Sequence, residues 1–523
     1  MAGKHSAAGL YFVSIVPLAL LVIFLIQSLT PYGSATSPDS ISYLDTAFNI
    51  KEGNGLVTTN VSFDAAGTNS QSPQRLWPPA YPALLSLFIE SPFDVENVSV
   101  LSGILLLLSS TLIFGILRTA KIDWLVSLLI SMLAILNLSM LLVYTYAWSE
   151  TLFIPILLSM ILVAFQYLRC SDISVRVRIT LIGLFVILSL ALLFTRYIGL
   201  AMILLFPLIY VLSNRSRSDK VIIFSGLVVY IVLASLFLAQ NHQITGSISG
   251  GKRPPSSLTL SENLQHLAEA FSTIFPASLM GVGLGALLAG SALYSVAAAK
   301  KSWAANTSLN KLRLKYVVIL GFVAVLYLSA LVALRTNASF DQIDVRLIAP
   351  ALPVTVLGLA ILPAITVKRV AFFSVGMVSL SLIFMLAIRG WTGVTNTLVN
   401  WEKSGNPELP MRGSVVFNNF TAGPEGRQDA AALRSLVDEK GFLFIETPLF
   451  WRFITQRESY SIPSTIDHAV IDRLNTVPQG SLIIVSAAQA REMRSILARR
   501  GLEMQVVNMG EMVGVRLPFS ARG

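Results

Sequence analysis

Residues 11–29 read YFVSIVPLALLVIFLIQSL, a mainly apolar run long enough to cross a lipid bilayer as one helix. Similar runs recur over the first three quarters of the chain, which is 54% hydrophobic and only 13% charged. A soluble domain carries about 25% charged residues. We therefore predict a polytopic α-helical membrane protein with eleven spans, near residues 10–29, 98–118, 123–140, 150–169, 179–195, 197–213, 220–239, 275–298, 315–334, 346–366 and 370–388. The first run is too long, and too poorly followed by a small-residue cleavage site, for a cleaved signal peptide.

Positive charge predicts the orientation. Lysines and arginines gather in one alternating set of the predicted loops, which should therefore face the cytoplasm. This distribution explains most of the net charge of +10 without a nucleic-acid surface. The odd number of spans then places the first long loop, and everything after about Arg389, on the outer face. The single cysteine, Cys170, falls in a cytoplasmic loop, so no disulfide can staple the exterior parts, and we expect a bacterial cytoplasmic (inner) membrane.

The composition changes after about residue 400. Long apolar runs stop there, charges become frequent, and short strand-like segments alternate with helix-like ones. This alternation predicts a small α/β domain with a mainly parallel sheet. We expect a transmembrane catalytic domain over residues 1–395, with its first outer loop over 30–97, and a soluble periplasmic α/β domain over 396–523. The second domain contains no glycine-rich phosphate loop, and we expect an accessory role for it, such as acceptor binding.

Polar residues crowd into the predicted outer face. The first loop opens with SPDSISYLDTAFNIKEGNGL at residues 37–56, although a plain connector between two helices needs no carboxylates. Ionisable groups at span ends are costly and are therefore functional candidates by default. The candidates are Asp39, Tyr43, Asp45 and Lys51 in the first loop, Arg75 and Tyr81 in SPQRLWPPAYP, Glu150 in YTYAWSETL, Arg196 in LLFTRYIGL, and Asp344 and Arg346 in SFDQIDVRLIAPALPV.

Each candidate also has a simpler interpretation. Tyr81 and the neighbouring aromatic residues serve equally well as interfacial anchors. Arg196 and Arg346 have side chains that reach the lipid headgroups, and a carboxylate such as Glu150 or Asp39 suits a helix N-terminus. Their shared position at one membrane face is what these interpretations leave unexplained. It favours a cavity in which a general base meets an anionic ligand.

The order of these motifs resembles the GT-C superfamily of polytopic glycosyltransferases. The likeness is greatest to the bacterial branch similar to protein mannosyltransferases and aminoarabinose transferases. It rests on the aspartate in the first outer loop, the PPAYP turn, WSETL, TRYIGL, DVRLIAPALPV and the outer C-terminal domain containing FIETPLFWRFITQRESYSIPS. The resemblance extends over nearly the whole chain.

This resemblance implies that a sugar passes from a polyprenyl-phosphate carrier to an acceptor on the outer face, with inversion at the anomeric carbon. The enzyme would be a hexosyl- or pentosyltransferase, and its acceptor a cell-envelope glycan, glycolipid or protein. Asp39 matches the general base, with Asp45 as its competitor. Cations should face the leaving phosphate: Arg196 and Arg346 are the first choices, and Lys51 and Arg75 the second. Supporting roles fall to Glu150, Tyr43, Tyr81 and Asp344.

Some relatives of this superfamily bind a divalent metal, for which Asp39 and Glu150 would be two ligands. No compact third acidic ligand is evident, so no metal is predicted to be required. Two rival functions stay open. A lipid-linked glycan flippase or transporter is the non-enzyme alternative, although the paired repeats typical of transporters are missing. An O-antigen-polymerase-type enzyme is the other, although the 240–274 loop holds only Lys252 and Arg253 as basic residues.

Overall fold

The chain forms two compact units. The computed structural model describes residues 2–30, 33–68, 70–169, 174–213, 217–251, 253–274, 308–365, 383–384, 386–392, 434–438, 440–445, 448–463, 465–478, 480–500, 504–509 and 512–516. The first of the two compact units, here called the helical unit, comprises Met1–Pro31, Arg75–Tyr81 and Ser99–Asn400. The second, the loop–sheet unit, comprises Tyr32–Gln74, Pro82–Val98 and Trp401–Gly523. Cys170, the expected span 275–298 and most of the expected span 370–388 lie outside the described residues.

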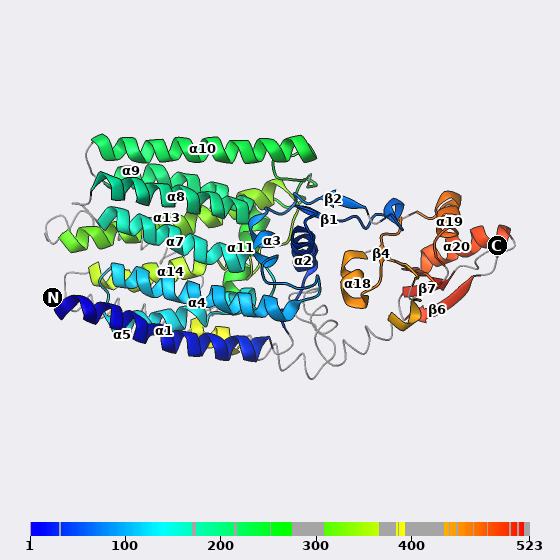
Figure 1. The fold of residues 1–523 in the computed structure, drawn as a ribbon, viewed down its shortest axis with the longest axis horizontal. Coiled ribbons are helices and arrows are strands. Elements are labelled where there is room, and N and C mark those ends of the chain that lie inside the picture. Colours follow the sequence, from blue (N-terminus) through cyan, green and yellow to red (C-terminus); the bar gives the residue numbers. More distant parts are fainter. Residues whose placement is uncertain are drawn as a thin grey trace. The chain divides into compact units, whose positions relative to one another are not determined.

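The helical unit consists of long helices that run side by side (Figure 1). Apolar residues dominate these helices. Each helix hydrogen-bonds its own backbone polar groups internally, as a bilayer requires. In chain order they are α1 (Ala2–Leu29), α4 (Val95–Thr119), α5 (Trp124–Ile135), α6 (Leu138–Thr145), α7 (Glu150–Arg169), α8 (Val175–Thr195), η2 (Tyr197–Leu204), α9 (Leu205–Ser213), α10 (Arg217–Thr245), α11 (Leu260–Ile274), α13 (Ser308–Asn337), α14 (Ala351–Ile361) and η3 (Leu362–Ile365).

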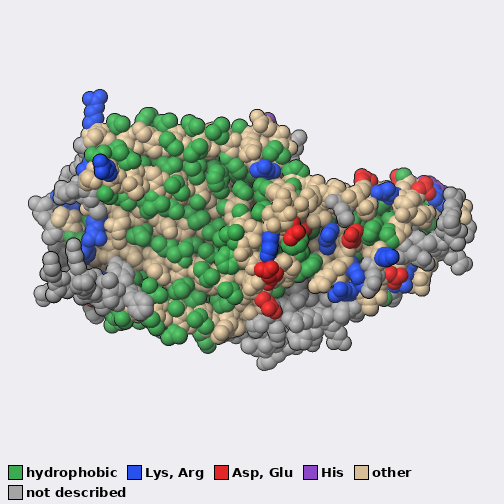
Figure 2. All heavy atoms as spheres, in the orientation of Figure 1, with side chains coloured by type: hydrophobic (Ala, Val, Ile, Leu, Met, Phe, Trp, Pro, Cys, Tyr) green, Lys and Arg blue, Asp and Glu red, His purple; other side chains and the backbone are tan. Residues whose placement is uncertain are grey.

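Among the described residues, five helices are long and apolar enough to cross a membrane: α4, α7, α8, α10 and α13. Helices α5 and α6 make a sixth if counted together; they bend by 61° where Asn137 caps α6 by accepting the amide of Met140 at 3.0 Å. Shorter apolar helices occupy Val13–Leu29, Tyr197–Ser213 and Ala351–Ile365. Apolar side chains cover the visible face of this unit (Figure 2). The chain is thus a multi-pass membrane protein, whereas the count of eleven spans stays a prediction.

The chain breaks its helix at Arg196, between the predicted spans 179–195 and 197–213. Helix α8 ends at Thr195 and η2 begins at Tyr197, with Arg196 extended between them at φ −152° and ψ 136°. A Cβ atom on Gly199 would lie 2.4 Å from the backbone of Leu192, so a side chain here would collide with the end of α8. The glycine therefore lets the chain turn tightly enough to leave Arg196 at a helix end.

The loop–sheet unit combines the first loop with the C-terminal part of the chain. The loop contributes α2 (Pro38–Lys51), β1 (Val57–Thr59), η1 (Phe63–Ala65) and β2 (Gln71–Pro73), and β1 pairs antiparallel with β2. The C-terminal elements are β3 (Leu443–Phe444), α18 (Pro448–Thr455), β4 (Ser459–Tyr460), α19 (His468–Leu474), β5 (Leu482–Ser486), α20 (Ala487–Arg499), β6 (Gln505–Met509) and β7 (Met512–Arg516). Helix α3 (Ala80–Leu85) lies where the two units meet in the sequence.

The C-terminal strands form a mixed sheet in the order β4-β3-β5-β7-β6. β3 is parallel to β4 and β5, but β5 with β7 and β7 with β6 are antiparallel. The prediction of a mainly parallel sheet was therefore wrong for β6 and β7. These strands pair up to Met509 opposite Met512, and so short a connection permits only a hairpin.

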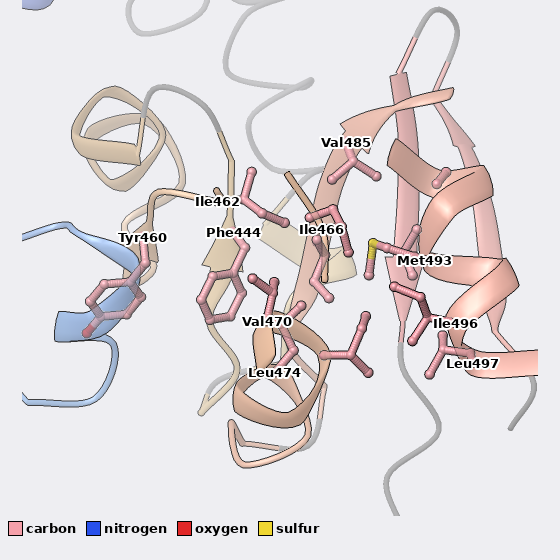
Figure 3. Packing of buried hydrophobic residues seen from close by; sticks show 14 of the residues in the cluster. Phe444, Tyr460, Ile462, Ile466, Val470, Leu474, Val485, Met493, Ile496 and Leu497 are labelled. Carbon is pink, nitrogen blue, oxygen red and sulfur yellow. The ribbon is translucent and has the colours of Figure 1, made fainter. Parts of the chain in front are cut away.

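A buried apolar cluster holds the sheet and its helices together (Figure 3). Its members include Phe444 of β3, Val485 of β5, Ile471 of α19 and Leu497 of α20, each with at most 1% of its surface exposed. Ser486 starts α20 with a capping box to Gln489, which satisfies backbone amides of its first turn. Ala66, from the first loop, also belongs to this cluster.

Candidate active site

A buried carboxylate, Glu150, gathers two arginines from distant parts of the helical unit. It begins α7 and has no exposed surface. Arg196 Nη1 lies 2.5 Å and Arg346 Nε 2.8 Å from the same oxygen, Glu150 Oε1. Ser149 Oγ accepts a hydrogen bond from Arg196 Nη1 at 3.2 Å. Two guanidinium groups therefore share this buried carboxylate.

An aromatic stack supports this ion cluster. The Arg346 guanidinium lies 4.2 Å from the ring centroid of Trp148, and that ring stacks on Tyr146 with centroids 4.1 Å apart. A cation over an aromatic face gains about 0.5–2 kcal/mol, depending on its desolvation. Arg346 is therefore fixed by a ring on one face and by Glu150 at its edge.

Two aspartates lie near Arg346, in the turn before α14. Asp341 Oδ2 is 3.5 Å from Arg346 Nη1 and is largely exposed. Asp344 Oδ1 accepts the amide of Leu347 at 3.0 Å. Burial raises the pKa of Asp344 to about 6, against the influence of that hydrogen bond and of the arginine. The carboxyl group of Asp344 therefore changes its charge near neutral pH.

A second group of cations lies elsewhere in the helical unit. The guanidinium of Arg253 is 5.1 Å from the Trp77 ring centroid and 5.8 Å from the Phe340 ring centroid. The guanidinium of Arg335 is 5.5 Å from the same Phe340 centroid. Arg75 and Arg253 both interact electrostatically with the Tyr197 side chain. Within the described part of the chain, no carboxylate forms an ion pair with Arg75, Arg253 or Arg335. Among the residues that the structure describes, this group therefore gathers positive charge that no ion pair neutralises.

Tyr197 holds the backbone around these cations. Its hydroxyl donates to the carbonyl of Arg75 at 2.7 Å and accepts from Asn241 Nδ2 at 3.0 Å. Gly250, at φ +76°, packs so closely on the Arg75 carbonyl that a Cβ atom would lie 1.6 Å from it. Three segments far apart in the sequence thus meet at Arg75, and only glycine fits at that meeting point.

Asp39 and Asp45, the two candidate bases of the first loop, both lie in helix α2 but have different surroundings. Ser37 caps the helix by accepting the amide of Ser40, so Asp39, partly exposed in the first turn, is not the N-cap. Asp45 is buried, and its carboxylate accepts Thr58 Oγ1 at 2.7 Å and the amide and hydroxyl of Thr59 at 2.7 and 2.8 Å. Asp45 therefore pins β1 to α2, which weakens its competition with Asp39 for the role of base.

Three other predicted residues differ in exposure: Lys51 is exposed, whereas Tyr43 and Tyr81 are buried. Lys51 Nζ donates to Glu90 Oε2 at 3.0 Å and to the carbonyl of Ile89 at 2.7 Å. Tyr43 and Tyr81 are each only 1% exposed. These observations leave the proposed role of Lys51 in phosphate binding untested, but they show that its ammonium already has two partners.

The structure thus sorts the predicted residues into groups. It brings Glu150, Arg196, Arg346 and Asp344 together, and it places Arg75 with a different set of cations. Asp39, Tyr43 and Lys51 belong to the loop–sheet unit. Arg253 was not among the site residues predicted from the sequence, although Lys252 and Arg253 are the only lysine and arginine in the 240–274 loop.

Comparison with known proteins identifies the fold. No protein-family model and no curated protein matches the sequence. The solved structure of ArnT from Cupriavidus metallidurans bound to undecaprenyl phosphate aligns with a TM-score of 0.55 and 12% identity, over 97% of this chain and 98% of that one. Its apo form aligns with a TM-score of 0.54 and 14% identity, over 98% of both chains. This chain shares its fold with these ArnT structures. At such low identity, the likeness concerns the fold alone.

Proposed function

We propose that the chain is a membrane glycosyltransferase that takes a sugar from a polyprenyl-phosphate carrier and passes it to a cell-envelope acceptor. The supporting observation is the alignment, over almost the full length of both chains, with an ArnT structure that holds undecaprenyl phosphate. The acceptor would be a glycan, a glycolipid or a protein. Arg75 and Arg253 of the helical unit, which form no ion pair with a described carboxylate, suit the phosphate of such a carrier.

In this reaction Asp39 is the proposed general base. The acceptor hydroxyl forms a bond to the anomeric carbon and gives its proton to the Asp39 carboxylate. The bond from that carbon to the carrier phosphate breaks at the same time, and the phosphate leaves with the electron pair, so the configuration inverts. A positioned base accelerates such a step by about 10²–10⁴-fold. Asp45 is less suited to the role because its oxygens already accept three hydrogen bonds.

The leaving phosphate gains negative charge, so nearby cations would lower the barrier. Arg196, Arg346, Arg75 and Lys51 remain the proposed donor ligands, and the geometry adds Arg253. We expect Arg75 and Arg253 to contribute more than Arg196 and Arg346, because the latter share the carboxylate of Glu150. Glu150, Tyr43, Tyr81 and Asp344 are proposed to support this arrangement rather than to react.

Sugar transfer by purified protein in lipid nanodiscs tests the proposal. A panel of polyprenyl-phosphate sugars is offered to the wild type, to Asp39→Asn and to Glu52→Gln, which removes an exposed carboxylate at the other end of α2. We expect one donor to be consumed, Asp39→Asn to be slower by about 100-fold with unchanged donor binding, and Glu52→Gln to match the wild type. An Asp39→Asn enzyme as fast as the wild type removes Asp39 from the mechanism. Transbilayer movement of the lipid without any sugar transfer favours the transporter instead.

We also propose that the N-terminus is cytoplasmic and the C-terminal part extracytoplasmic in a bacterial inner membrane. Because Cys170 is the single cysteine, a Cys170→Ser background permits single-cysteine labelling. In spheroplasts, a membrane-impermeant maleimide should label Thr68→Cys and leave Ser218→Cys unlabelled until the cells are lysed. Labelling in the reverse pattern contradicts this orientation.

A further inference from the structure

The first loop docks onto the C-terminal sheet within the loop–sheet unit. The amide of Ser461, directly after β4, donates to the carbonyl of Val61 at 2.7 Å, and the amide of Gly67 donates to Tyr460 Oη at 3.2 Å. β4 is an edge strand of the sheet, so its outer side is open to another segment of the chain. Figure 3 shows the Tyr460 ring against the blue segment of the first loop. Residues 61–67 are therefore called the docking segment.

Apolar contacts strengthen this docking. The ring centroids of Phe63 and Phe444 lie 5.8 Å apart at an interplanar angle of 62°, an edge-to-face arrangement. Ala66 is part of the buried cluster under the sheet. Arg473 of α19 donates to the carbonyls of Asp64 and Ala66 at 3.3 and 3.4 Å. The docking segment thus forms part of the core of the C-terminal fold.

Hydrogen bonds close to the docking segment connect it to helix α2. Two residues before Val61, Thr59 donates twice to the carboxylate of Asp45, which lies within α2. Helix α18 of the C-terminal part also contacts α2 directly. Asp39 lies six residues from Asp45 on the same helix, and a helix transmits displacement along its length because its backbone is hydrogen-bonded throughout.

We propose that the C-terminal sheet positions the first outer loop, and that Phe63 and Tyr460 are positioning residues for the reaction of Asp39. This inference rests on the proposed function. A displacement of about 1 Å between reacting groups can cost about 10²-fold in rate. The C-terminal part would thus set the rate of transfer without touching either substrate.

Phe63→Ala in the full-length protein tests this inference by two readouts, hydrogen exchange and sugar transfer. We expect the variant to exchange backbone amides of α2 about tenfold faster and to lower kcat about tenfold, with the Kd for the donor unchanged. Asp64→Ala is the matched control, because only its backbone carbonyl takes part in the docking. Phe63→Leu should recover most of the loss, since it restores apolar volume.

Tyr460→Phe keeps the ring and removes the hydroxyl, which accepts the amide of Gly67 and donates to Glu458 Oε2 at 2.7 Å. This variant is used if Phe63→Ala does not fold. For it we expect a rise of about threefold in α2 exchange. Unchanged exchange in α2, or faster exchange with full kcat, overturns the inference. If the wild type transfers no sugar at all, the proposed function fails, whereas the exchange experiment still decides whether docking constrains α2.

Discussion

Replacing Glu150 by glutamine should destabilise the protein more than removing either of its arginines. At an effective dielectric constant of about 20, charges separated by 2.5 and 2.8 Å attract by about 6 kcal/mol each. Desolvation offsets much of this attraction, and breaking a buried ion pair from one side costs about 3–5 kcal/mol. Glu150→Gln leaves a half-buried Arg196 facing a neutral amide and a buried Arg346 paired with the exposed Asp341, so we expect a loss within that range.

Arg346→Gln leaves a different situation, because Arg196 and Glu150 remain as a neutral pair. The variant loses a charge-assisted hydrogen bond and the contact with Trp148, for which we expect about 1–3 kcal/mol. Arg176→Gln, on the exposed start of α8, is the control and should stay within about 0.5 kcal/mol of the wild type.

The free energy of unfolding of the three variants can be compared in mixed detergent–SDS micelles, where the folded and unfolded states interconvert. The expected order of destabilisation is Glu150→Gln, then Arg346→Gln, then Arg176→Gln. If Glu150→Gln is less destabilising than Arg346→Gln, or costs less than about 1 kcal/mol, the argument from a shared buried carboxylate is refuted.

Three further outcomes follow from the same contacts. Because the pKa of Asp344 is raised to about 6 from 3.8, its contribution to stability is complete below about pH 4 and is lost as the pH rises through about 6. Asp344→Asn should therefore raise the free energy of unfolding at pH 8 by at most about 3 kcal/mol and leave it unchanged at pH 4. The melting temperature at the two pH values checks this. Asp45→Ala should cost about 1–3 kcal/mol and accelerate hydrogen exchange in β1, because three hydrogen-bond donors lose their acceptor. Arg253→Gln should weaken binding of a polyprenyl phosphate by about tenfold in calorimetry, and Arg196→Gln by less; equal effects contradict the ranking of the two cation groups.

Much of the fold could be predicted from local sequence. Apolar runs of about 20 residues predict helices wherever they occur, because lipid leaves the backbone no other partner. The interruption at Arg196 was equally visible, since a charged residue inside an apolar run seldom continues the span. Strand and helix segments near the C-terminus were also readable, but the direction of β6 and β7 depended on a short hairpin connection.

What the sequence by itself determined is therefore the membrane class, the break between α8 and η2, and the crowding of polar residues after the first span. Tertiary structure alone decided that Glu150 pairs with both Arg196 and Arg346, and that the Asp45 carboxylate binds β1 to α2. It also decided that the docking segment is part of the C-terminal core. The physical reason is range. Hydropathy and capping act within a few turns of chain, whereas these contacts join residues 13 positions apart at Asp45 and 393 positions apart at Tyr460, and depend on how the helices and strands pack.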